Sequence, residues 1–293
     1  MTSPLAQSPA PAVTTVDRTP VPTTVLMCAP EHFNVLYEIN PWMDASVPTD
    51  TDKAVAQWQD LKNTYASLGI HVHEIPAEEG LPDMVYAANG ALVVDSIAYT
   101  ASFLHPERQP EAAAYAAWLA RAGYTVVEAT EVNEGEGDFL LVGDAILAGT
   151  GFRSSIASHR ELERVFGREV VTLTLVRPEY YHLDTALSVL DDRPGHEVIA
   201  YLPSAFSPES LAVLQSRFPD AILVDEDEAA MLGLNLVSNG RDVVLPVRAT
   251  KFAAELTERG FKPVGIDLSE LLKGGGGVKC CTLALRGART EQD

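Results

Sequence analysis

Residues 139 to 176 read FLLVGDAILAGTGFRSSIASHRELERVFGREVVTLTLV, and they contain one full copy of the pattern that predicts the fold. Two apolar runs, Phe139–Val142 and Ala145–Ala148, surround a Gly-Asp turn signal and predict a β-hairpin. A helix is expected to begin near Ser155 and to end at Gly167, because glycine tolerates the left-handed conformation that ends helices. A third apolar run, VVTLTLV, predicts another strand. The unit therefore has the order ββαβ.

The same pattern occurs four more times along the chain. Further amphipathic helices are expected to begin near Thr51, Glu107, Ser207 and Thr250. Each is followed by a strand-like run, which starts at His71, Thr125, Ala221 and Pro263 respectively. The other hairpins are ALVVD–SIAYTA, TALSVL–HEVIAYL, LNLV–RDVVLPV and, joining the two ends of the chain, CCTLAL with VLMC. A period of roughly 40–60 residues that occurs five times indicates an internally symmetric array.

Five such units in a line would leave sheet edges open, and a closed ring removes this problem as it does in propellers. We therefore expect a single α/β domain over residues 25–293 that forms a five-bladed α/β propeller of ββαβ units. The pattern alone leaves an ordinary doubly wound sheet as an alternative. Residues 1–24 are rich in Pro, Ser and Thr, and we expect them to form a disordered leader.

The charge and the cysteines limit the function. The chain has 293 residues, with 41 Asp and Glu against 21 Lys and Arg, and its formal net charge is -20. This excess of acid argues against nucleic acid and anionic membranes as partners. No apolar run approaches the roughly 18 residues of a membrane span. The three cysteines are too few for a disulfide framework, so we expect a cytoplasmic protein. The sequence leaves the oligomeric state open, including a homo-oligomer.

One loop in each unit carries residues that are suited to chemistry, and the loops would meet on the axis of a ring. Four polar loops are LPDMVYAANG, NEGEGDFL, YYHLDTAL and MLGLNLVSNG, and the fifth is the glycine-rich KGGGGVKCC. Their candidate residues are Asp83, Asn89, Glu134, Glu136, Asp138, His182, Asp184, Asn235 and Cys280. A thiol, an imidazole and several carboxylates are what nucleophilic catalysis requires, and the acids would suit a cationic substrate.

The same residues also allow structural interpretations. Cys280 could be a buried strand cysteine and His182 a structural histidine. The run Gly274–Gly277 before Cys280 favours a close approach of the backbone to another group. This run leads into a strand rather than a helix, which argues against a phosphate-binding loop. His71 and His73 alternate on a strand but have no third ligand at a suitable spacing, so neither a metal nor a cofactor is expected.

The motifs HLDT (182–185), GEGD (135–138) and GGGxxCC (275–281) resemble the guanidino-group-modifying, or pentein, superfamily. The resemblance extends from about Val25 to Leu285 and implies a five-bladed α/β propeller. It also implies a hydrolase acting on C–N bonds, with Cys280 as the nucleophile on the guanidinium carbon and a covalent thiouronium-type intermediate. The family includes arginine deiminases, dimethylarginine dimethylaminohydrolases, amidinotransferases and arginine dihydrolases.

The resemblance implies further roles. His182 would be the general acid and base, and Asp184 would grip the guanidinium. Either Glu134 or Glu136 would pair with the histidine, and the sequence does not decide between them. Arg153 would receive the substrate's α-carboxylate, although a surface charge at a helix N-terminus is equally compatible. Asp83 is another acid that could meet the cation.

Position 89 departs from the usual pattern, because deiminases and dimethylargininases usually have Asp in this loop. Asn89, with Asn40 and Arg108, resembles the arginine dihydrolase type, which converts arginine to ornithine, ammonia and carbon dioxide. An arginine dihydrolase-like enzyme is therefore favoured, with a small cationic guanidino compound as its partner. The alternatives are a dimethylargininase or deiminase that gives citrulline, an amidinotransferase, and an inactive pentein-fold binding protein.

Overall fold

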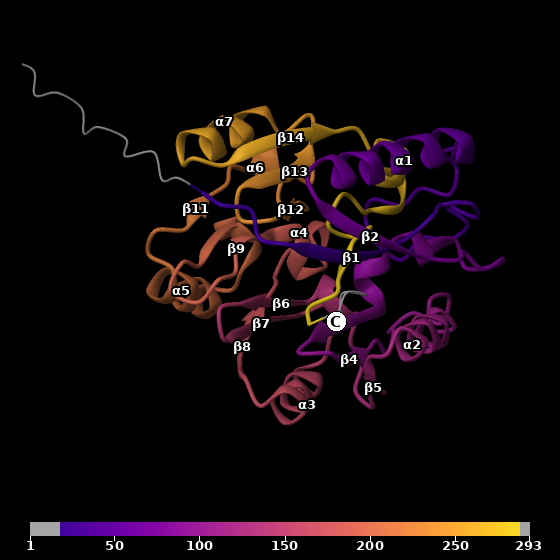
Figure 1. The fold of residues 1–293 in the computed structure, drawn as a ribbon, viewed down its shortest axis with the longest axis horizontal. Coiled ribbons are helices and arrows are strands. Elements are labelled where there is room, and N and C mark those ends of the chain that lie inside the picture. The colour runs from indigo at the N-terminus through magenta and orange to yellow at the C-terminus, as the bar shows by residue number, and fades with distance from the viewer. Residues whose placement is uncertain (1–17, 288–293) are drawn as a thin grey trace, which may run out of the picture.

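A computed structural model of the chain describes residues 18–287. Its strands form five three-stranded sheets that surround a common centre, and the long helices α1, α2, α3, α5 and α7 lie at the periphery (Figure 1). In every sheet the middle strand pairs antiparallel with its hairpin partner and parallel with the strand that follows the helix. The predicted ββαβ blade is thus confirmed five times, and the doubly wound alternative is wrong.

The first three blades in chain order begin with the one that joins the two ends of the chain. That blade contains β15 (Leu283–Ala284), β1 (Thr23–Cys28), α1 (Thr51–Ser67) and β2 (Ile70–Ile75). The second contains β3 (Ala91–Val94), β4 (Ile97–Thr100), α2 (Glu111–Arg121) and β5 (Thr125–Val127). The third contains β6 (Phe139–Val142), β7 (Ala145–Thr150), α3 (Ile156–Phe166) and β8 (Glu169–Thr174).

The last two blades follow the same plan. The fourth contains β9 (Leu187–Asp191), β10 (Val198–Tyr201), α5 (Pro208–Arg217) and β11 (Ile222–Leu223). The fifth contains β12 (Val237–Ser238), β13 (Asp242–Pro246), α7 (Thr250–Glu258) and β14 (Lys262–Ile266). Two short helices, α4 (Leu183–Ala186) and α6 (Glu226–Ala229), precede β9 and β12. Strands β1 and β15 pair through Val25 with Ala284 and Leu26 with Leu283, and this pairing closes the ring.

Local sequence explains where the helices begin and end. Asp50 caps α1 by accepting a hydrogen bond from the Lys53 amide at 3.0 Å. Gly167 ends α3 with φ at 62°, as predicted from its position. Helix α2 begins at Glu111 rather than near Glu107, because the preceding residues form turns that carry Arg108 into the interior.

The boundary of the leader requires a correction. Residues 1–17 of the predicted leader 1–24 lie outside the described residues, whereas Arg18 and Val21 pack on the last blade. The Arg18 guanidinium lies 3.6 Å from the centre of the Phe261 ring, and the Val21 amide donates to Asn239 O at 2.7 Å. Strand β1 already begins at Thr23.

None of the helices within residues 18–287 is long and apolar enough to cross a membrane.

Candidate active site

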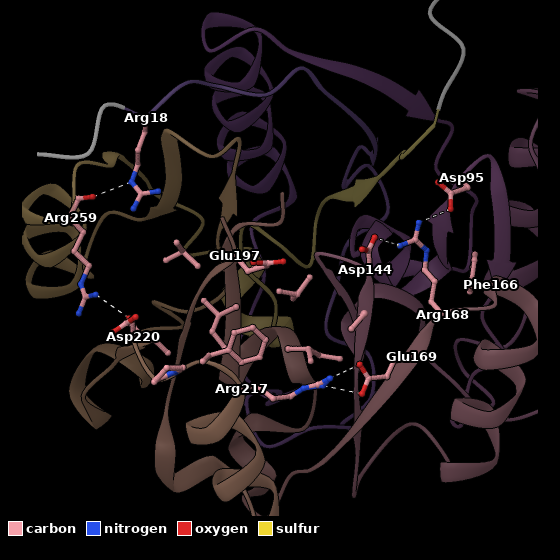
Figure 2. A pocket seen from close by; sticks show the side chains of 18 of the residues that line it. Arg18, Asp95, Asp144, Phe166, Arg168, Glu169, Glu197, Arg217, Asp220 and Arg259 are labelled. Carbon is pink, nitrogen blue, oxygen red and sulfur yellow. Dashed lines mark hydrogen bonds and ion pairs between the residues drawn. The ribbon is translucent and has the colours of Figure 1, made fainter. Parts of the chain in front are cut away.

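Loops from different blades meet at a small buried cavity of about 10 Å³, close to the minimum that one water needs. Its lining includes Asn40, Asp83, Asn89, Arg108, Arg153, Tyr181 and Cys280. A much larger surface groove of about 1410 Å³ lies elsewhere and is lined by other parts of the chain (Figure 2). Charged residues of that groove pair with one another, as Arg168 does with Asp95 and Arg217 with Glu169. The small cavity is therefore the candidate active site.

Cys280 lies at the end of the glycine-rich loop and is 2% exposed. Its Sγ accepts a hydrogen bond from Asn235 Nδ2 at 3.1 Å and lies 3.5 Å from Asp184 Oδ2. Burial and the nearby Asp184 carboxylate raise the pKa of the Cys280 thiol, while hydrogen bonds from the Gly277 backbone and the Asn235 amide oppose this rise. The thiol is thus neutral in the empty site, and a bound cation would favour the thiolate.

His182 directly precedes α4 and pairs with a glutamate. Its Nε2 lies 2.7 Å from Glu134 Oε2, and its buried Nδ1 has no hydrogen-bond partner among residues 18–287. Glu134 also accepts two hydrogen bonds from Arg153 Nη1, at 2.9 and 3.0 Å. Burial alone would raise the pKa of Glu134, but Arg153 and then His182 outweigh burial and hold this pKa well below its ordinary value. The histidine therefore faces a permanently charged carboxylate.

Glu136, the other glutamate that the sequence left open, points away from His182. It accepts hydrogen bonds from Lys279 Nζ at 2.8 Å and from the Ala284 amide at 2.9 Å, and it pairs with Arg286. Burial would raise the pKa of Glu136, but Lys279 and Arg286 lower it. The expectation that Glu136 takes part in catalysis therefore needs correcting, since its carboxylate forms an ion-pair network with residues on both sides of Cys280.

Two buried aspartates flank the histidine loop. Burial raises the pKa of Asp184 to about 7, against the opposing effects of Lys279 and of hydrogen bonds with Cys280 and Asn235. Asp138 accepts hydrogen bonds from Ser154 Oγ at 2.6 Å and from the Leu183 amide at 3.1 Å, and burial raises its pKa to about 6. Asp138 thus fixes the backbone beside His182, whereas Asp184 faces the thiol.

Arg108 organises the opposite wall of the cavity. Its buried guanidinium donates two hydrogen bonds to Glu111, at 2.9 and 2.8 Å, and one to Asn89 Oδ1 at 2.8 Å. The Asn89 amide in turn donates to Glu134 O at 3.3 Å. Asp83 accepts a hydrogen bond from Tyr37 at 2.9 Å, but its buried Oδ1 has no partner among the described residues. Burial raises the pKa of Asp83, although Arg108 and Tyr37 oppose this effect.

A loop between β1 and α1 covers the cavity. Asn40 donates from Nδ2 to Gly274 O at 3.1 Å, and Arg153 Nη2 donates to Ile39 O at 2.7 Å. Arg153 is 5% exposed, so the interpretation as a surface charge is wrong. The glycine run allows the expected close approach, because a Cβ on Gly276 would lie 2.2 Å from the Tyr86 ring. The predicted site residues therefore line one cavity or, in the case of Glu134, His182 and Asp184, contact a residue that lines it. Glu136 does neither.

The sequence places Asn235 among the candidates by its position in the fourth loop but assigns it no role. Tyr37 and Glu111 support Asp83 and Arg108 from sequence positions that carried no motif. Within residues 18–287, no group of three or more His, Cys, Asp or Glu is arranged to hold a metal ion.

Comparisons with known proteins show which family the chain belongs to. Residues 38–286 match the family described as "N,N dimethylarginine dimethylhydrolase, eukaryotic". An N(G),N(G)-dimethylarginine dimethylaminohydrolase of Mycobacterium tuberculosis is 52% identical, over 92% of this chain and 87% of the relative. The bifunctional arginine dihydrolase/ornithine cyclodeaminase ArgZ of Synechocystis is 36% identical, over 88% of this chain and 37% of its own length.

The likeness extends to solved structures. The N-terminal domain of ArgZ, an arginine dihydrolase from the ornithine-ammonia cycle in cyanobacteria, has been solved bound to substrate. It superposes with a TM-score of 0.86 at 34% identity, over 90% of this chain and 98% of that domain. These matches confirm the resemblance to the pentein superfamily and its five-bladed fold. The chain therefore belongs to the N,N-dimethylarginine dimethylhydrolase family.

Proposed function

We propose that this chain is a cysteine hydrolase of the guanidino group that converts arginine and two waters to ornithine, two ammonia and carbon dioxide. The observation that supports this proposal best is that Cys280 lines the buried cavity while His182 packs on Tyr181, which also lines it. Each of the two residues contacts its own carboxylate. A thiol without a base, or a base without an orienting acid, would not serve nucleophilic catalysis.

The first half-reaction forms the covalent intermediate. The guanidinium binds beside Asp184, its positive charge favours the Cys280 thiolate, and the thiol proton passes to water. The thiolate then attacks the guanidinium carbon and forms a C–S bond. His182, held by Glu134, protonates the departing nitrogen, so that ammonia leaves as the C–N bond breaks. The product is a thiouronium-type adduct on Cys280.

The second half-reaction releases the substrate carbon. His182, now neutral, takes a proton from water, the hydroxide adds to the adduct carbon, and the C–S electron pair returns to Cys280. This step gives a ureido group, as in citrulline. In the dihydrolase, the thiolate attacks this carbon again and expels a second ammonia. Hydrolysis of the resulting thiocarbamate then gives ornithine and carbon dioxide.

Substrate binding uses the remaining polar residues. Arg153 receives the α-carboxylate, and Asp83 Oδ1, which has no described partner, accepts a hydrogen bond from a cationic N–H of the substrate. Asn40, Asn89 and Arg108 complete the polar wall. A cavity of about 10 Å³ is far too small for arginine, so the loop that carries Asn40 must open before the substrate can enter.

Asn89 favours the dihydrolase over an enzyme that stops at citrulline. Its neutral amide takes the place where related deiminases have a carboxylate, and it lies against Arg108 rather than free in the cavity. Less negative charge around the substrate would let a neutral ureido intermediate stay bound for a second attack. The second candidate, hydrolysis of dimethylarginine to citrulline, is favoured by the 52% identity with the mycobacterial relative.

Product analysis separates these candidates. Purified protein is incubated with arginine, dimethylarginine or citrulline, and ammonia, amines and amino acids are quantified. Ornithine with two ammonia per arginine is expected. Dimethylamine release would identify the second candidate, and transfer to an added amine would identify an amidinotransferase. Absence of turnover with all three substrates, or full turnover in Cys280→Ser, would refute the proposal. In Asn89→Asp the ornithine share should fall, and an unchanged ornithine yield would refute the role of Asn89.

The proposal includes a cytoplasmic location and a small-molecule partner. The three cysteines, Cys28, Cys280 and Cys281, are all unpaired in the structure, as expected in a reducing compartment. The net charge of -20 supports a cationic small molecule over a polyanion as the ligand.

A further inference from the structure

We propose that Asn235 is a catalytic residue, whose side-chain amide donates a hydrogen bond that stabilises the Cys280 thiolate. The inference rests on the proposed function, in which that thiolate is the nucleophile. The contact itself is direct, because Asn235 Nδ2 lies 3.1 Å from Cys280 Sγ and both residues are buried.

The orientation of the Asn235 amide is fixed by the backbone on both sides. Its Oδ1 accepts from the Cys280 amide at 3.1 Å, and its Nδ2 donates to Asp184 O at 3.2 Å. A backbone N–H can only donate and a backbone carbonyl can only accept, so a reversed amide would lose both bonds. The group that faces Sγ is therefore an N–H donor.

The surroundings of Sγ make this donor important. The other side-chain contact of Sγ is Asp184, whose oxygens lie at 3.5 and 3.8 Å. Once the thiol has lost its proton, this carboxylate becomes a like charge beside the sulfur. The neighbouring Lys279 directs its ammonium to Glu136 and to Thr282 O. The Gly277 backbone also favours the thiolate, and among the side chains within residues 18–287 the Asn235 amide is its favourable contact.

The chain positions Asn235 by an unusual turn. Leu232 has φ at 54°, in the left-handed region that residues with a Cβ rarely adopt. Its carbonyl oxygen accepts a hydrogen bond from the backbone N–H of Asn235 at 2.9 Å. Strain of this kind persists where the surrounding structure imposes it, often at functional sites. The turn places the Asn235 side chain behind Cys280, and Asn235 is not among the residues that line the substrate cavity.

The same hydrogen bond serves two steps of each hydrolysis. The Sγ electron pair is on the sulfur before attack, forms the C–S bond in the adduct, and returns to the sulfur when water displaces it. The Asn235 N–H therefore stabilises both the attacking thiolate and the departing thiolate. A change at Asn235 should lower kcat and leave KM close to the wild-type value, because the substrate does not touch it.

The test measures the thiol directly, without substrate. The rate of Cys280 alkylation by iodoacetamide is followed from pH 6 to 10 by mass spectrometry, and fragmentation of the labelled peptide assigns the label to Cys280 rather than to the adjacent Cys281. Because burial raises the pKa of the Cys280 thiol, the thiolate is a minor species in this range and the rate measures its population. In Asn235→Ala the rate at each pH should fall roughly ten- to a hundredfold, since a hydrogen bond to a charged group is lost. The kcat should fall by a similar factor.

Matched variants separate this effect from loss of fold. Asn239→Ala removes another buried asparagine four residues away, whose side chain contacts Arg241 and Asp242 instead of the thiol, and it should keep the wild-type alkylation profile. Asn235→Asp keeps the shape but replaces the donor with a carboxylate, and it should lower the alkylation rate further. A wild-type alkylation profile in Asn235→Ala or Asn235→Asp would overturn the inference. Failure of the proposed function would instead appear as no turnover in the wild type, with the alkylation results unaffected.

Discussion

Replacing Asp184 with asparagine should make the protein more stable and less active. Asp184 is 1% exposed, and burial raises its pKa from 3.8 to about 7. The folded state therefore favours the protonated acid, so the stability linked to Asp184 is complete at low pH and is lost as the pH rises through about 7. The asparagine side chain would have the same shape as the aspartate but no charge to desolvate.

The size of the effect follows from the two pKa values. Asp184 lowers the unfolding free energy by about 4 kcal/mol at pH 8, where it is ionised, and by about 1 to 2 kcal/mol at pH 5, where the folded state must keep it protonated, at 1.36 kcal/mol for each unit of pKa difference. The advantage of Asp184→Asn in unfolding free energy should therefore grow by about 2 to 3 kcal/mol between pH 5 and pH 8. Meanwhile kcat/KM for arginine should fall by about a hundredfold or more, because a buried partner of the guanidinium is gone.

Urea unfolding at several pH values, with kinetics on the same samples, measures both effects. Asp242→Asn is the matched control, because Asp242 is equally buried but its ion pair with Arg241 at 2.8 Å helps to lower its pKa. That variant should lose stability at pH 8 and keep its activity. If the stability difference between wild type and Asp184→Asn does not change with pH, burial does not destabilise the ionised form of Asp184 in the folded state, and the reasoning is refuted.

Three further changes test other parts of the site. Glu134→Gln should cost about 3–5 kcal/mol in urea unfolding, because it leaves the buried Arg153 charge without its partner, and kcat should fall at least about a hundredfold; near-wild-type kcat would contradict the pairing with His182. Gly276→Ala should lower the unfolding free energy by about 1–3 kcal/mol and reduce kcat, because the new Cβ would lie 2.2 Å from the Tyr86 ring. Unchanged kinetics would show that the loop is not tightly packed. Tyr37→Phe removes a hydrogen bond that lowers the pKa of Asp83, so this pKa should rise and the KM for arginine should increase most at the acid end of the pH range; a KM ratio to wild type that does not change with pH would argue against it.

The fold was predictable because its signals are local and repeated. Each blade contains a hairpin, an amphipathic helix and a strand, so one pattern occurs five times along the chain. The closing pair β1 and β15 followed from the leftover strands at the two ends. The start of β1 was less predictable, because the packing of Arg18 on Phe261 joins residues far apart in the sequence.

The chemistry of the site was predictable, but its pairings were not. Cys280 and His182 stand in distinctive motifs, whereas Glu134 and Glu136 are two residues apart in a glycine-rich turn. The structure distinguishes them by the direction in which each carboxylate points, toward His182 or toward Lys279. The buried pairs depend on contacts between blades, which no spacing in the sequence reports.

Mass analysis of Cys280 during turnover tests the central proposal most directly. Wild-type protein is mixed with arginine, quenched in acid within the steady state and digested, and the mass of the Cys280 peptide is measured. We expect an adduct with the mass of arginine less one ammonia, which fragmentation of the peptide assigns to Cys280 rather than to the adjacent Cys281, together with no product from Cys280→Ala. Ornithine or citrulline formation by Cys280→Ala at the wild-type rate would contradict it.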